Sequence, residues 1–166
     1  AALIFGSGMA AVSTSLLAFL QKGDHLVLPR QIYGGTYNLL TEEFGKYGIE
    51  YTFIAQTRAS DYERAIRPNT RVCYLETPSN PLLAVTDLQA VAKLARSRGI
   101  HTMIDNTFAS PVNQNPVDFG IDIVIHSATK YVGGHGDALG GIVIAGRERI
   151  TAMHDALKIT GGNLGP

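Results

Sequence analysis

Apolar segments of strand length alternate along this chain with segments of helical periodicity. The strand-like segments lie at residues 2–5, 25–28, 50–54, 71–75, 101–104, 121–125 and 142–145. The helical pattern occurs between or after them, at residues 9–20, 37–46, 62–66, 87–98 and 148–159. Because strands joined by helices form right-handed crossovers, such strands lie parallel in one sheet. The sequence therefore predicts an α/β fold with a mostly parallel sheet flanked by helices.

The segment 87–98 has the clearest helical pattern. Its apolar residues recur at the spacing of one helix face: Leu88, Val91, Ala92 and Ala95. Thr86 and Gln89 have the spacing of a capping box, which predicts Thr86 as the N-cap. Gly99 stands where a C-terminal cap belongs.

The charge balance limits the partners of the chain. Fourteen basic and 14 acidic residues give a formal net charge of zero, whereas nucleic acids and anionic membranes require a basic face. We therefore expect no nucleic-acid partner and no membrane partner. The single cysteine, Cys73, excludes an internal disulfide and a cysteine-based zinc site. A reducing, cytoplasmic setting is expected.

The first 20 residues carry no charge, yet they do not have the pattern of a membrane helix. Glycines at positions 6 and 8 and hydroxyl residues at 13–15 interrupt the run, and a span needs about 20 predominantly apolar residues. The better interpretation is a strand, a glycine turn and a helix with one apolar face: Met9, Val12, Leu16 and Leu20. Because the chain opens within a strand and without Met, we expect a fragment of a longer protein.

Polar residues and glycines follow the predicted strands. They are Gly6-Ser7-Gly8, Tyr33-Gly34-Gly35, Asn80, Asp105-Asn106 and Ser127-Ala128-Thr129-Lys130. In open parallel sheets, ligands bind outside the carboxyl ends of the strands. These residues therefore predict a ligand site along one edge of the sheet.

One alternative is a dinucleotide site, because residues 6–11 match the pattern G-x-G-x-x-A after a strand. That pattern requires an acidic residue at the end of the second strand to bind ribose. The only nearby acid, Asp24, precedes the second strand, so a NAD-binding oxidoreductase is the weaker hypothesis. The glycine turn can still bind a phosphate at the helix N-terminus.

A metal site is not predicted. His126 and His135 have no acidic or second histidine ligand at helical spacing. Cys73 lies among apolar residues in mid-strand, so we interpret it as inert core.

The most informative segment is the one in which an apolar strand leads directly to Ser127, Thr129 and Lys130. Hydroxyls at alternating positions can bind one phosphate, and Asp105 closes an earlier strand at the same sheet edge. An amine, a phosphate site and a buried carboxylate are together what pyridoxal phosphate requires. The lysine forms a Schiff base with the aldehyde, and the carboxylate favours the protonated ring nitrogen.

The sequence resembles the Cys/Met-metabolism family of pyridoxal phosphate enzymes, which includes cystathionine lyases and synthase, methionine γ-lyase and O-acylhomoserine sulfhydrylases. The resemblance covers nearly the whole chain and implies fold type I. The matching motifs occur in family order: Ser7-Gly8-Met9-Ala10-Ala11, Tyr33-Gly34-Gly35-Thr36, Glu76-Thr77-Pro78-Ser79-Asn80-Pro81, Asp105-Asn106-Thr107-Phe108, Ser127-Ala128-Thr129-Lys130-Tyr131 and Gly134-His135.

The resemblance implies three catalytic residues. Lys130 is expected to hold the cofactor covalently and then to move protons between substrate carbons. Asp105 is expected to pair with the ring nitrogen. Tyr33 is expected to stack on the ring and to assist proton transfer.

The resemblance also implies how the rest of the cofactor is bound. The backbone N–H groups of Gly8 and Met9, with the hydroxyls of Ser127 and Thr129, are expected to bind the phosphate. Asn80 is expected to bond the hydroxyl oxygen of the ring.

The activity implied is γ-elimination or γ-replacement on a sulfur-containing or homoserine-derived amino acid, and several members remain open. Gly35 stands where methionine γ-lyases carry Cys, and Asn38 where cystathionine γ-lyases and synthases carry Arg. The string at residues 36–39 is more similar to the sulfhydrylases, and that at 134–137 to the lyases. O-acylhomoserine sulfhydrylase and cystathionine γ-synthase are therefore the alternatives.

Family members are about twice as long or longer. Residues 1–166 are thus expected to be a fragment of the large, cofactor-binding domain, without the N-terminal arm and the C-terminal small domain. Those parts supply the substrate-carboxylate Arg and the phosphate ligands from a neighbouring subunit. We expect a dimer-based homotetramer for the full-length protein and no turnover from the 166 residues alone.

Overall fold

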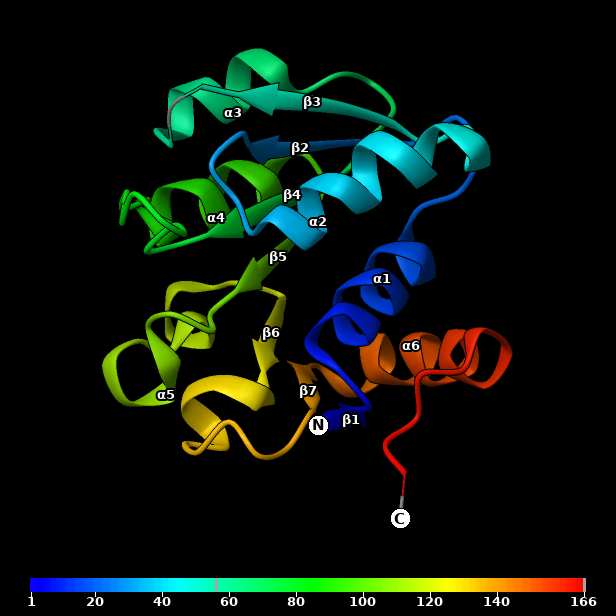
Figure 1. The fold of residues 1–166 in the computed structure, drawn as a ribbon. Coiled ribbons are helices and arrows are strands. Elements are labelled where there is room, and N and C mark those ends of the chain that lie inside the picture. The colour runs from blue at the N-terminus through cyan, green and yellow to red at the C-terminus, as the bar shows by residue number, and fades with distance from the viewer. Residues whose placement is uncertain (56, 166) are drawn as a thin grey trace.

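The computed structural model describes residues 1–55 and 57–165, and within them seven strands form one mixed sheet (Figure 1). The strands are β1 (Ala2–Phe5), β2 (His25–Pro29), β3 (Glu50–Ile54), β4 (Thr70–Glu76), β5 (His101–Asp105), β6 (Ile123–Ser127) and β7 (Gly141–Ala145). They lie in the order β1-β7-β6-β5-β4-β2-β3. Pairing is parallel from β3 through β6, whereas β7 is antiparallel to both β6 and β1. The predicted mostly parallel sheet is confirmed.

Helices cover both faces of this sheet (Figure 1). They are α1 (Gly8–Phe19), α2 (Gly34–Asn38), α3 (Ala59–Ala65), α4 (Leu88–Ser97), α5 (Ser110–Asn113) and α6 (Arg147–Thr160). One core cluster contains buried residues of α1 and α6, and a second contains those of α3 and α4. No helix among the described residues is both long and apolar enough to cross a membrane.

The alternation of side chains along a strand fixes which residues face α1. On β4, Val72 and Tyr74 belong to the α1 cluster, whereas Cys73 and Leu75 belong to the α4 cluster. Because successive side chains point to opposite faces, Glu76 at the end of β4 lies on the α1 face.

The same alternation applies to the neighbouring strands. Met103 on β5 and Ile125 on β6 are in the α1 cluster. The strand-end residues Asp105 and Ser127, two positions further on, therefore share that face with Glu76.

The predicted N-cap of α4 was wrong. Asp87 caps the helix, because its Oδ1 accepts the Ala90 N–H at 2.9 Å. Thr86 lies one residue earlier and is buried, where its N–H donates to Thr77 Oγ1 at 3.0 Å. Gly99 has a φ of +66° after the helix, as its position predicted.

The predicted helix at 37–46 is not continuous. α2 is followed by a π-helical turn (η1, Leu39–Glu43) and a 3₁₀ turn (η2, Phe44–Tyr47). Buried Leu40 and Phe44 join the α1 core cluster. Gly48, in the left-handed conformation, ends the segment. The α5 helix and the 3₁₀ turn η3 (Pro116–Phe119) were not predicted.

Candidate active site

The carboxyl ends of the parallel strands border a cavity of about 590 Å³. Every site residue predicted from the sequence lines it: Gly8, Met9, Tyr33, Asn80, Asp105, Ser127, Thr129 and Lys130. Its size is in the range of small-molecule sites. Glu76 and Thr107 also line the cavity, although the sequence had given neither a role.

The N-terminus of α1 forms one wall of the cavity. Ser7 is its N-cap, and the Ser7 hydroxyl accepts the Ala10 N–H at 3.0 Å. A Cβ at Gly8 would lie 2.8 Å from Ser127 Cβ and 2.9 Å from its Oγ. Only glycine therefore allows the start of α1 to approach the end of β6 this closely. The first N–H groups of a helix lack intrahelical acceptors and favour an anion.

The residues after β6 form the opposite wall. Ser127 donates its backbone N–H to Thr107 Oγ1 at 2.8 Å, which ties the end of β6 to the residues after β5. Thr129 is held by Gly140, whose N–H donates to Thr129 Oγ1 at 3.1 Å. These contacts fix two hydroxyl-bearing residues beside the start of α1.

Lys130 lies in the turn that follows, η4 (Ala128–Val132). Its backbone, with φ −93° and ψ −118°, departs from helical geometry and interrupts the turn. Among the residues that the structure describes, no carboxylate forms an ion pair with the Lys130 amine. The amine is thus available to the cavity that its residue lines.

Asp105 ends β5 on the same side of the sheet. Its Oδ1 accepts the Thr107 N–H at 2.9 Å. Burial raises the pKa of this carboxyl, and the hydrogen bonds from Thr107 partly offset that effect. Among the described residues no cationic side chain pairs with Asp105, so this half-buried acid is suited to bind a cationic or N–H-bearing ligand.

Glu76 was missed, although the signal that pointed to Asp105, an acid closing an apolar strand, is present there too. Its Oε2 accepts the Tyr33 N–H and its Oε1 the Asn80 N–H, both at 2.8 Å. The side chain is buried. Burial, and secondly the nearby Asp105 carboxylate, raise the pKa of Glu76 to about 7.

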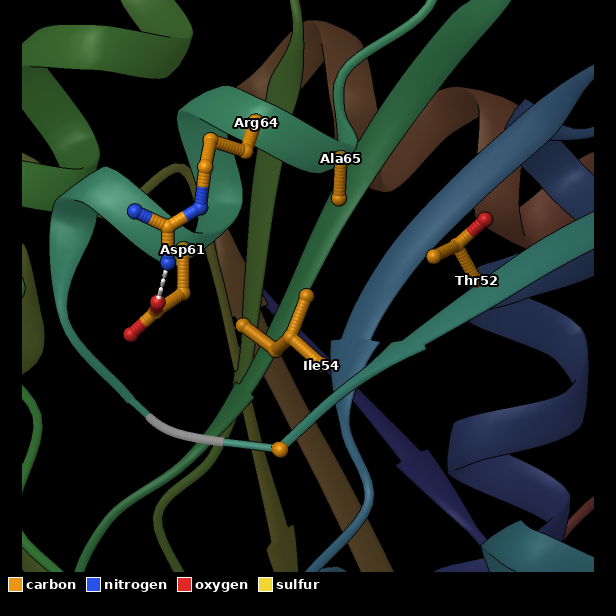
Figure 2. A pocket seen from close by; sticks show the side chains of 6 residues that line it. Thr52, Ile54, Asp61, Arg64 and Ala65 are labelled. Carbon is orange, nitrogen blue, oxygen red and sulfur yellow. Dashed lines mark hydrogen bonds and ion pairs between the residues drawn. The ribbon is translucent and has the colours of Figure 1, made fainter.

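A second hollow, of about 410 Å³, lies between β3 and α3 (Figure 2). Figure 2 shows an ion pair between Arg64 and Asp61 on its α3 side, which leaves both charged groups partnered. None of its lining residues was predicted for a site. β3 is the outermost strand, separated from β6 by three others. This hollow is therefore not part of the Lys130 site.

Other candidates from the sequence lie away from the cavity. Cys73 is fully buried, and burial raises the pKa of its thiol to about 12, consistent with an inert core residue. Asp24 precedes β2, at the edge opposite the cavity, and pairs with Arg71 at 3.4 Å. Among residues 1–55 and 57–165, no three His, Cys, Asp or Glu side chains are grouped to hold a metal ion.

Comparison with known protein families shows which family the chain belongs to. The family model described as "Cys/Met metabolism PLP-dependent enzyme" matches residues 1–166. The chain belongs to this family. Members depend on pyridoxal phosphate (PLP), so the family accounts for a lysine, an acid and hydroxyls around one cavity.

Two curated members of the family come from Bacillus subtilis. The chain is 47% identical over 163 residues to a cystathionine gamma-lyase, covering 98% of this chain and 43% of the relative. It is 48% identical over 146 residues to cystathionine beta-lyase MetC, covering 88% and 37% respectively. The chain thus spans less than half the length of these relatives.

The fold is shared with a solved member of the family. The cystathionine gamma-lyase from Lactobacillus plantarum, in complex with L-serine, superposes with a TM-score of 0.95 and 40% identity. The match covers 99% of this chain and 43% of the solved chain. The mixed seven-stranded sheet is therefore the fold-type I architecture of this PLP-dependent family.

The residues that line the cavity have the chemical groups that PLP requires. The start of α1 approaches the end of β6 closely because Gly8 has no side chain, which brings the first N–H groups of the helix beside the Ser127 hydroxyl. Asp105 and Lys130 also line the cavity, and neither forms an ion pair within the described residues.

Proposed function

We propose that the full-length protein is a PLP-dependent enzyme of cysteine and methionine metabolism. Its reaction is γ-elimination or γ-replacement on a sulfur-containing or homoserine-derived amino acid. The observation that carries this proposal is the placement of Lys130 and Asp105 around one cavity, facing the N-terminus of α1. O-acylhomoserine sulfhydrylase and cystathionine γ-synthase remain the alternatives, and relatives of the chain include both a cystathionine gamma-lyase and a probable cystathionine gamma-synthase.

Four residues bind the phosphate in this proposal. The N–H groups of Gly8 and Met9 point from the first turn of α1, where the helix dipole favours negative charge. The hydroxyls of Ser127 and Thr129 contribute from the facing wall. Thr129 is oriented by its hydrogen bond with Gly140.

Three residues hold the ring. Asp105 would pair with the ring nitrogen, because an anion beside that nitrogen stabilises its protonated form. Tyr33 would stack on the ring, and Asn80 would bond the ring hydroxyl oxygen. A Cβ at Gly35 would lie 2.5 Å from Tyr33 Cε1, so this glycine permits the observed position of the tyrosine.

Lys130 carries the proton chemistry. When bound, PLP accepts the electron pair released at the α-carbon of an amino-acid substrate. Lys130 would hold the group through its amine, and the free amine would take the α-proton of the substrate and return protons at the neighbouring carbons. Tyr33, which lines the same cavity, would assist this proton transfer.

The rest of the site is proposed to come from outside these residues. The chain spans 43% of the first relative, and the substrate-carboxylate Arg belongs to the remainder. We further propose a homo-oligomer in which a neighbouring subunit completes the phosphate site, and a cytoplasmic location.

Product analysis of the full-length protein tests the reaction. Cystathionine, methionine and acylhomoserines are each incubated with the protein, and the keto acid released is identified. Each incubation is repeated with an added thiol, so that γ-replacement can be detected as a new γ-substituted amino acid. The proposal predicts 2-oxobutanoate or this substituted amino acid from at least one substrate, and neither from the Lys130→Ala variant. Pyruvate alone would indicate β-elimination instead, and the absence of both products would refute the proposal.

A further inference from the structure

Glu76 links the loop after β2 to the loop after β4 in the cavity wall. It ends β4, and its two carboxylate oxygens accept one N–H from the loop after β2 and one from the loop after β4. Those N–H groups belong to Tyr33 and Asn80, the residues proposed to stack on the ring and to bond its hydroxyl oxygen. Among the described residues, Glu76 is the carboxylate that accepts hydrogen bonds from both of these N–H groups.

Because position 76 is buried, only an acidic side chain can accept both N–H groups there. Glu76 is only 4% exposed, so water does not readily replace a lost acceptor. A carboxylate offers two acceptor oxygens, whereas a glutamine offers one oxygen and one NH₂ group. Glutamine at position 76 would therefore turn a donor towards one of the two N–H groups.

We propose that Glu76 is a positioning residue that sets Tyr33 and Asn80 together against the cofactor ring. This inference rests on the proposed function, and it deepens the account of the same site. Glu76 acts through the backbone of these two residues and takes no part in the bond-breaking steps. Its loss should loosen the ring-binding side of the cavity and leave the phosphate side, at Gly8 and Ser127, in place.

Amide hydrogen exchange on the full-length apoprotein tests the proposal without any need for activity. Hydrogen bonds to charged groups are stronger than those between neutral groups, so in Glu76→Gln we expect exchange at Tyr33 or Asn80 to rise by about tenfold or more. The dissociation constant for PLP should rise by about tenfold. Asp122→Asn is the matched control, because Asp122 also accepts a backbone N–H, from Thr102 at 3.0 Å, at the opposite sheet edge.

The control should leave exchange at Tyr33 and Asn80, and the affinity for PLP, within about twofold of wild type. Exchange in Glu76→Gln within about twofold of wild type at both amides would overturn the proposal. So would an equal acceleration in Asp122→Asn, since the effect would then reflect general destabilisation. Failure of Lys130 to bind the cofactor would refute the proposed function but would leave these exchange rates unchanged.

Discussion

Glu76 and Asp105 stand directly opposite each other at the ends of β4 and β5, in parallel register and on the face covered by α1. Both carboxyl pKa values are raised, mainly by burial. Two neighbouring acids at one sheet edge resist becoming charged together, and a cationic ring beside Asp105 would relieve that repulsion. The apoprotein therefore carries an electrostatic strain that a cofactor can remove.

The raised pKa of Glu76 predicts how apoprotein stability depends on pH. Between its ordinary pKa of 4.5 and the folded value of about 7, the folded state binds more protons than the unfolded state. Stability should thus fall as pH rises through this interval, by about 3 kcal/mol from this group. Asp105 contributes in the same direction.

The measurement is urea unfolding of full-length apoprotein and of Glu76→Gln at pH 4.5, 6 and 8. The variant should show a smaller loss of stability between pH 4.5 and pH 8 than the wild type. Parallel stability curves for the two proteins would show that Glu76 titrates normally.

Replacement of Gly8 should damage the phosphate side of the cavity. In Gly8→Ala the new Cβ would meet Ser127 Cβ at 2.8 Å, which forces α1 and β6 apart. We expect a loss of about 1–3 kcal/mol of stability from overpacking and a weaker affinity for PLP. Gly45→Ala is the matched control, because nothing lies within 4 Å of the added Cβ. Equal PLP affinities in the two variants would contradict the assigned phosphate site.

Cys73 should be unreactive in the folded protein. It is fully buried, and its pKa is raised to about 12, so the thiolate required for alkylation is scarce near neutral pH. Labelling with iodoacetamide, followed by mass spectrometry of the Cys73 peptide, should show modification only after unfolding in urea. Rapid labelling under native conditions would mean that the strand β4 is accessible.

The sequence alone predicted those features of the fold and of the site that depend on local residue patterns. Apolar runs located all seven strands, and the polar residues that follow them located the cavity, because parallel strands end at a common edge. The N-cap of α4 was misplaced by one residue, since Thr86 and Asp87 both have side chains able to cap and only packing selects between them.

The sequence showed that an acid closes the strand at Glu76, but it could not show which groups this acid binds. The Tyr33 N–H comes from 43 positions earlier in the chain, and no spacing rule connects a carboxylate to a backbone group in another loop. The division of the segment 37–46 into the end of α2, a π-helical turn and a 3₁₀ turn was missed for a similar reason, since burial of Leu40 and Phe44 in the α1 cluster is a tertiary contact.

The proposed role of Lys130 as the residue that holds the cofactor can be measured directly. Full-length protein reconstituted with PLP is reduced with borohydride, digested and analysed by mass spectrometry. We expect a pyridoxyl-phosphate adduct on the peptide containing Lys130, and no adduct at that position in the Lys130→Ala variant. An adduct on a different lysine, with Lys130 unmodified, would contradict this role.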